Sequence, residues 1–269
     1  MFKVNRAIPW NYSEENRELV FLIKTLNKKY LNDTLKQGTL CFNAPTVFQT
    51  SDNLTRGQKD EWDSYLSFTA KNIHYARIIS QDETGVHYDI PQKLADSAQM
   101  RLISNVSQHT PLCSFRKVEE ADIIEKHGAC FFQLGNIVDK IKDEFGHDSF
   151  ILVFYPYELI KRISMKSSCY ARSIHYGEID KAFQDYLDSF EFPQKEMFQK
   201  GIDYEWQKEF RIIIEPTQKS GPIIIKVGSI EDIAIGGNIE ELRHGFIFGE
   251  SDKQIRTAIE KMKVSGGFI

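Results

Sequence analysis

The residues with the most evident chemical potential are Glu209 and Arg211, which lie two positions apart in an otherwise apolar segment. From Lys208 onwards the side chains alternate as in a strand, so Glu209 and Arg211 share one face. Burying either charge alone is costly, so the two must be paired, hydrated in a cleft or in contact with a ligand. An internal ion pair accounts for the pattern, and so does a place on the wall of an active site with Glu209 as the catalytic carboxylate.

A second candidate segment is the predicted strand 168–176. Alternation places Arg172 on the same face as Tyr170 and Tyr176, an arrangement that suits stacking or the binding of an anion. The strand ends at His175 and Tyr176, where a side chain can face a cleft and act as an acid or a base, and we take Tyr176 as a candidate catalytic residue. An amphipathic outer face of the sheet explains the same pattern.

Most motifs of well-known enzyme classes are absent from the chain. There is no GxxxxGK[ST], no GxGxxG after a strand, no GxSxG and no HExxH, which argues against P-loop, Rossmann, α/β-hydrolase and zincin enzymes. The seven histidines are scattered singly, so no metal site is predicted. The four cysteines lie far apart without a CxxC pair, each among apolar neighbours, which predicts buried reduced thiols. They are Cys41, Cys113, Cys130 and Cys169.

Composition indicates an ordinary globular protein. The 269 residues are 41% hydrophobic and 12% aromatic, enough to bury one large core or two modest ones. Basic and acidic residues, 34 and 38 in number, are well mixed, so bulk nucleic-acid binding is not indicated, although a local basic groove stays open. No run of 18 apolar residues and no signal-peptide pattern is found, so we expect no membrane association and a cytoplasmic location.

The pattern of elements predicts an α+β fold around a mixed, mostly antiparallel sheet with flanking helices, with a split of the sheet left open. We expect one domain over residues 1–269, because no repeat, linker or low-complexity segment interrupts the chain. The predicted strands are 19–26, 39–42, 65–70, 73–80, 85–90, 112–115, 129–134, 149–155, 168–176, 208–215, 223–227, 232–235 and 245–249, with a turn at Gly236-Gly237. The predicted helices follow Asn27 up to Gly38 and occupy 91–97, 119–126, 136–145, 157–163, 179–190 and 252–262.

Residues 51–63 form a long polar loop between predicted strands. It carries Arg56, Asp60, Glu61 and Trp62, and loops of this length inside a compact domain are functional or disordered. The tryptophan favours docking of part of the loop.

Several short motifs together resemble a large bacterial and phage family, the one numbered 2971 among domains of unknown function. The similarity rests on the helix-Gly38-strand unit followed by 43–48, on 56–61, on 113–115, on Lys208-Glu209-Phe210-Arg211-Ile212 and on 230–236. The family pattern reads Glu-x-Glu-x-Arg, whereas this chain has Gln207 at the first position. If the first glutamate is essential, activity here is affected; if Glu209 is the working carboxylate, nothing is lost.

The order of these elements is also similar to that of ADP-ribosyltransferase toxins, including DNA-targeting ones of toxin–antitoxin systems. This similarity implies NAD as the donor, Glu209 beside the oxocarbenium-like ribose, and Lys24, Asn43, Arg56, Arg172 and Arg211 as candidates to hold NAD. The expected acceptor is nucleic acid or protein, with an antitoxin as a further partner and defence or counter-defence as the setting.

Two other functions stay open. Asp60, Glu61 and Glu209 could bind divalent cations in a metal-dependent nuclease, because clustered carboxylates hold Mg²⁺. Alternatively, the chain is a non-catalytic binding module of a defence system that uses the loop at 51–63. Binding of NAD without metal favours the transferase, loss of function on chelation favours the nuclease, and a silent Glu209→Gln change favours the module.

Overall fold

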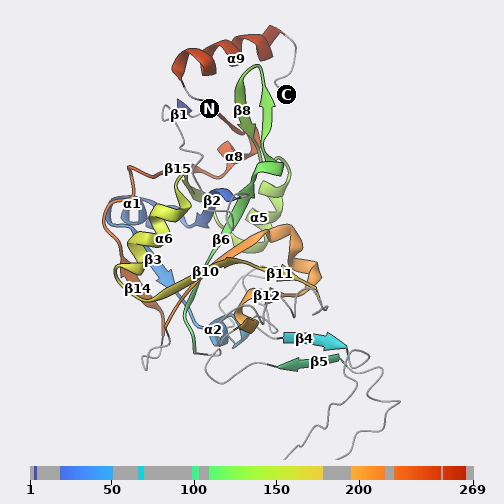
Figure 1. Ribbon diagram of the computed structural model, residues 1–269, viewed down its shortest axis with the longest axis vertical. Coiled ribbons are helices and arrows are strands. Elements are labelled where there is room, and N and C mark those ends of the chain that lie inside the picture. Colours follow the sequence, from blue (N-terminus) through green and yellow to red (C-terminus); the bar gives the residue numbers. More distant parts are fainter. Residues whose placement is uncertain are drawn as a thin grey trace, which may run out of the picture.

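A six-stranded antiparallel sheet is the centre of the computed structural model (Figure 1). Its strands lie in the order β10-β13-β6-β2-β9-β15, and every neighbouring pair is antiparallel. With its flanking helices it confirms the predicted α+β class. The structure describes residues 3–4, 19–50, 66–69, 99–102, 109–177, 195–215, 221–249 and 251–264.

The six strands come from distant parts of the chain. They are β2 (Leu19–Leu26), β6 (Leu112–Glu119), β9 (Ser149–Val153), β10 (Cys169–Ser173), β13 (Glu209–Ile214) and β15 (Ala234–Asn238). β13 pairs with both β10 and β6, and all six of its residues are buried. The Glu209 strand is therefore an interior strand of the sheet, and its polar side chains lie inside the protein.

Both faces of this sheet are covered by apolar side chains. One face packs against the helices α1 (Lys28–Gln37) and α6 (Pro156–Ser164) and against the strands β3 (Thr39–Phe42) and β14 (Ile223–Lys226). The strands β3 and β14 pair with each other. The other face packs against α5 (Ile137–Phe145), α8 (Glu240–His244) and β16 (Phe246–Phe248). Alternating residues of β2 and β9 serve the two cores, as the period of a strand requires.

Smaller sheets complete the described part of the chain. β16 pairs in parallel with β1 (Lys3–Val4) and antiparallel with β8 (Ala129–Phe132), which also pairs with β7 (Ile124–Lys126), and α9 (Asp252–Val264) packs on this sheet. β11 (His175–Tyr176) runs parallel to β12 (Gln199–Lys200), and β4 (Leu66–Thr69) is antiparallel to β5 (Gln99–Leu102). Short helical segments are α2 (Pro45–Thr50), η3 (Glu120–Asp122), η4 (Lys195–Phe198) and η5 (Ile202–Gln207).

The predicted helix boundaries around the site are confirmed by local contacts. The Asn27 side chain accepts a hydrogen bond from the Lys29 amide at 3.1 Å and caps α1. Gly38 ends this helix in the left-handed region, at φ 59°, where residues other than glycine are strained. Pro156 begins α6, where its missing amide proton has no helical partner to lose.

Other predictions of local structure are wrong. Residues 119–126, expected as a helix, contain the end of β6, the η3 turn and strand β7. The apolar spacing that suggests a helix there comes from a strand followed by a short hairpin. Gly236 and Gly237, expected as a turn, lie within β15 opposite β9, because this edge of the sheet lies close under α1 and α8.

Several predictions fall on residues outside the described ranges. They concern the loop 51–63 with Arg56, the strands 73–80 and 85–90, and the helices 91–97 and 179–190. The single-domain organisation stays a prediction. None of the helices in the described ranges has the length and apolar character needed to cross a bilayer.

Candidate functional site

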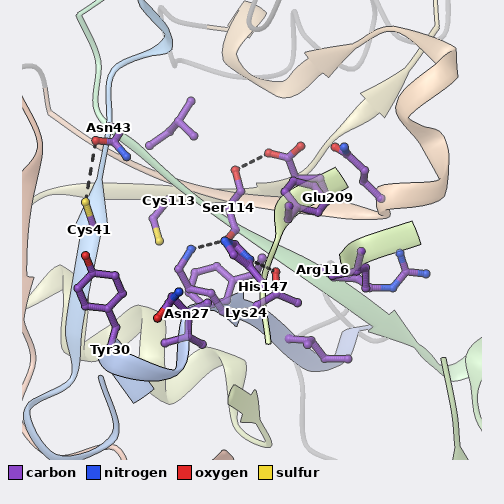
Figure 2. A pocket seen from close by; sticks show the side chains of 18 of the residues that line it. Lys24, Asn27, Tyr30, Cys41, Asn43, Cys113, Ser114, Arg116, His147 and Glu209 are labelled. Atoms are coloured by element: carbon purple, nitrogen blue, oxygen red, sulfur yellow. Dashed lines mark hydrogen bonds between the residues drawn. The ribbon is translucent and has the colours of Figure 1, made fainter. Parts of the chain in front are cut away.

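A cavity of about 320 Å³ lies beside the central sheet, where β2, β3, β6 and β13 come together. Figure 2 shows that its wall carries side chains from widely separated positions, including Lys24, Asn43, Ser114, His147 and Glu209. Apolar and polar groups alternate around it. The cavity therefore has the mixed lining of a small-molecule site, with a few polar groups placed among apolar ones.

Glu209 is the carboxylate of the cavity wall, and three side chains hold it. Its Oε1 accepts hydrogen bonds from Arg211 Nε at 2.7 Å and from the Ser114 hydroxyl. Its Oε2 lies 3.2 Å from Lys200 Nζ. Lys200 lies on β12, which pairs with β11, and Ser114 lies on β6, which pairs with β13. The cluster around Glu209 therefore depends on long-range strand pairing rather than on local sequence.

The charge state of Glu209 follows from these neighbours. Burial by itself would raise the pKa of the carboxyl, but the charges of Arg211 and Lys200, together with hydrogen bonds from Arg211 and Ser114, outweigh it. The pKa of Glu209 is held far below its ordinary value. The carboxylate is therefore ionised at neutral pH, so it accepts hydrogen bonds and cannot donate one.

Lys24 and Glu209 both contact Ser114, one through its backbone and the other through its side chain. Lys24 Nζ donates to the Ser114 carbonyl oxygen at 3.0 Å, whereas the Ser114 hydroxyl donates to Glu209 (Figure 2). The Lys24 ammonium also lies 5.1 Å from the centre of the Phe115 ring. A ligand that fills the cavity can therefore contact a cation and a carboxylate at the same time.

The cavity wall is electropositive. Within the described part of the chain, its charged side chains are Lys24, Arg116 and Lys200 against Glu209. Lys24 and Arg116 form no salt bridge with any described carboxylate, although the charge of Asp122 acts on Arg116 from a distance. Lys24 donates to the Ser114 carbonyl oxygen, and Arg116 donates to that of Trp206. Desolvation by burial lowers the pKa of Arg116, although it stays far above neutrality. An anionic ligand would neutralise this excess of positive charge.

Aromatic rings form another part of the wall. The Phe145 and His147 rings stack with centres 5.8 Å apart, and Trp206 lies 6.1 Å from Phe145. Lys140 covers the Trp206 ring at 4.2 Å. Together with Tyr30, which is half exposed at α1, these rings offer surfaces on which a planar heterocycle can stack.

His147 is neutral in this site. Burial and the charge of Lys24 lower its pKa from 6.5 to about 4, and its Nδ1 lies 2.8 Å from the Thr25 hydroxyl.

Because the unfolded chain takes up a proton on His147 near pH 6.5 and the folded protein only near pH 4, stability falls as the pH drops through this interval. We expect the melting temperature of wild type to fall more between pH 7.5 and pH 5 than that of His147→Asn, whose amide replaces Nδ1. Equal pH dependence of the two proteins would contradict the assignment.

Two thiols also line the cavity. Cys113 is fully buried, and burial raises the pKa of its thiol. Burial and the neighbouring Cys113 raise the pKa of Cys41, which donates to Asn43 Oδ1 at 3.9 Å. Both thiols are therefore protonated at neutral pH and poorly nucleophilic. Cys41 is exposed, and Cys130 and Cys169 are only partly buried, which corrects the prediction that all four thiols are buried.

The predicted site residues are distributed as follows. Lys24, Asn43 and Glu209 line the cavity, although they are far apart in sequence. Arg211 is fully buried and donates to the Met197 carbonyl oxygen at 2.7 Å, so it supports Glu209 from behind and is not part of the lining. Arg172, on the edge strand β10 opposite Arg211, is not part of the lining either.

Tyr176 lies next to the site without lining the cavity. Its hydroxyl oxygen accepts a hydrogen bond from the Glu209 amide at 2.6 Å. Burial and the Glu209 charge raise the pKa of this phenol, so it stays protonated at neutral pH and is a weak acid. Its contact fixes the backbone at Glu209, whereas a catalytic role for Tyr176 stays a prediction, as does any role of Arg56.

The site residues predicted from the sequence leave out several polar residues of the wall, among them Ser114, Arg116, His147, Lys200 and Gln207. Ser114 and Arg116 alternate with apolar residues of β6, a pattern that is also typical of a solvated strand face. Lys200 lies in the two-residue strand β12, which is too short to carry a periodic signal. A polar residue inside an otherwise apolar strand is the available signal, and it is the one that points to Glu209 and Arg211.

In the described ranges, no group of three or more His, Cys, Asp or Glu side chains is arranged to hold a metal ion. Comparison with protein-family models, with curated proteins and with solved structures found no match to this chain. The similarity to the family numbered 2971 therefore stays a prediction, and the functional argument depends on the cavity itself.

Proposed function

We propose that this protein binds NAD in the cavity and transfers its ADP-ribose to a nucleic-acid or protein acceptor. The observation that carries the proposal is the convergence of Lys24, Asn43 and Glu209 on one cavity wall. A toxin-like role in bacterial or phage conflict, with a partner antitoxin, is part of the same proposal.

The shape and charge of the cavity support a nucleotide ligand. Lys24 and Arg116, which form no salt bridge within the described part of the chain, would face the pyrophosphate, and the aromatic wall would stack on a heterocycle. The volume of about 320 Å³ is at the lower end of small-molecule sites, which span about 300–1,000 Å³. The cavity would thus enclose the nicotinamide riboside half of NAD, with the adenosine extending outwards.

The proposed reaction needs a carboxylate that never becomes protonated. The glycosidic C–N bond to nicotinamide breaks, and neutral nicotinamide leaves with the electron pair. A nucleophile of the acceptor then bonds to C1′ of the ribose and releases its proton to solvent. Glu209 would accept a hydrogen bond from a ribose hydroxyl and face the positive charge that develops on the sugar. Its ionised state, maintained by Arg211 and Lys200, fits this task.

Neither rival function gains an observation of its own. The carboxylates of the nuclease hypothesis, Asp60 and Glu61, lie outside the described residues. The binding-module hypothesis predicts that Glu209→Gln is functionally silent, so the same variant that tests the transferase also tests the module.

Binding of NAD can be measured by isothermal titration calorimetry with wild type and Lys24→Met. We expect the affinity to fall by about tenfold or more in the variant, because a charge-assisted hydrogen bond contributes about 1.5–3 kcal/mol. The matched control is Lys226→Met, which removes an exposed lysine that bonds Gln37 away from the cavity. Absence of binding to wild type, or equal affinity of wild type and Lys24→Met, would contradict the proposed site.

A further inference from the structure

Gln207 carries a buried side-chain amide whose oxygen is hydrogen-bonded and whose nitrogen is not. It lines the cavity and is 8% exposed, and its Oε1 accepts a hydrogen bond from Lys200 Nζ at 3.0 Å. Its Nε2 is buried and has no hydrogen-bond partner among the residues that the structure describes. The Lys200 contact fixes the orientation of the amide, because exchanging oxygen and nitrogen would place the NH₂ group against an ammonium.

An orphaned donor of this kind is costly to the folded protein. A buried donor without a partner destabilises a protein, because it loses its hydrogen bonds to water and gains none in exchange. Buried donors are satisfied in the great majority of cases, so an exception on a cavity wall points to a group that arrives with a ligand. The missing partner must be a hydrogen-bond acceptor, such as a carbonyl oxygen.

The backbone brings this donor next to the proposed reaction centre. Lys208, between Gln207 and Glu209, adopts the left-handed region with φ 43° and ends η5 immediately before β13. As a result, one ammonium, that of Lys200, bonds both Gln207 Oε1 and Glu209 Oε2. A ligand atom that meets the Gln207 amide therefore lies close to one that meets the Glu209 carboxylate.

We propose that the Gln207 amide is a specificity determinant that donates a hydrogen bond to the carboxamide oxygen of the nicotinamide ring. The inference rests on the proposed NAD-binding function and adds to it the group that recognises the leaving base. In NAD this carboxamide is carried by the ring that is bonded to the reacting ribose carbon. Gln207 and Glu209 would then contact the two sides of the bond that breaks.

The test compares NAD with ADP-ribose, which lacks the nicotinamide ring. Calorimetric affinities for both ligands are measured with wild type and with Gln207→Met, which has similar length but no donor. We expect the ratio of NAD affinity to ADP-ribose affinity to fall about tenfold in the variant, while the affinity for ADP-ribose stays within about twofold. The matched control is Gln37→Met, because Gln37 also accepts from a lysine, Lys226, but is exposed and outside the cavity.

A second variant guards against misfolding. Gln207→Glu keeps an oxygen acceptor for Lys200 and likewise lacks the amide donor, so the same fall in the ratio is expected. The melting temperature of each variant shows whether it is folded. An unchanged ratio in a folded variant would overturn the role of Gln207 while leaving NAD binding intact, whereas absence of NAD binding to wild type would overturn the proposed function itself.

Discussion

Replacing Arg211 by methionine is expected to destabilise the protein by about 3–5 kcal/mol, the range found when one partner of a buried ion pair is removed. Arg211 is fully buried, bonds Glu209 Oε1 at 2.7 Å and donates to the Met197 carbonyl oxygen. Its loss leaves Glu209 with less compensating charge and deprives a buried carbonyl of its donor. Urea denaturation followed by circular dichroism measures the change in the free energy of unfolding.

The control for this prediction is Arg162→Met, which makes the same substitution at a more exposed ion pair. Arg162 bonds Asp232 at 2.5 Å, but the Asp232 side chain is 53% exposed, so we expect a loss of about 1 kcal/mol or less. Equal effects of the two substitutions would show that the burial of the Glu209 cluster has no bearing on stability.

Glu209→Gln is expected to lower both stability and activity strongly. It leaves the positive charges of Lys200 and Arg211 buried without a carboxylate, for a loss of about 3–5 kcal/mol in the free energy of unfolding. We also expect transfer from NAD to fall by about 100-fold or more, because a group that stabilises developing charge is removed. Urea denaturation and transfer of radiolabel from NAD measure the two effects.

A double variant separates these two effects. Lys200→Met combined with Glu209→Gln removes one of the two stranded cations, so it is expected to be more stable than Glu209→Gln alone. It should nevertheless remain inactive, because the carboxylate is still missing. Recovery of transfer in this folded double variant would show that Glu209 has a structural role only.

The local part of the fold could be predicted from the sequence because its signals are local. Asn27, Gly38 and Pro156 set helix ends through their own caps and dihedral preferences, and the structure places the ends of α1 and the start of α6 there. The order of the strands in the sheet could not be predicted in this way. β13 lies between β10 and β6, which are separated from it by long stretches of chain, and only packing decides that order.

The same distinction applies to the site. Alternation predicts that Glu209 and Arg211 share a face, and the structure confirms the internal ion pair. Glu209 also lines a cavity, whereas its role as a catalytic carboxylate stays a proposal. Lys200 could not be found from the sequence, since it reaches Glu209 through the parallel pairing of β11 and β12. The sequence singles out Gln207 only as a departure from the family pattern. The structure shows that its Oε1 bonds Lys200 and that its Nε2 has no hydrogen-bond partner among the described residues.

The most direct test of the central claim is incubation of the wild-type protein and cell extract with NAD radiolabelled in its ADP-ribose portion. We predict that label enters the macromolecular fraction, that nicotinamide is released in equal amount, and that a folded Lys24→Met variant transfers less. If wild type neither transfers label nor releases nicotinamide, under conditions in which an established transferase does both, the cavity is not the site of an ADP-ribosyltransferase.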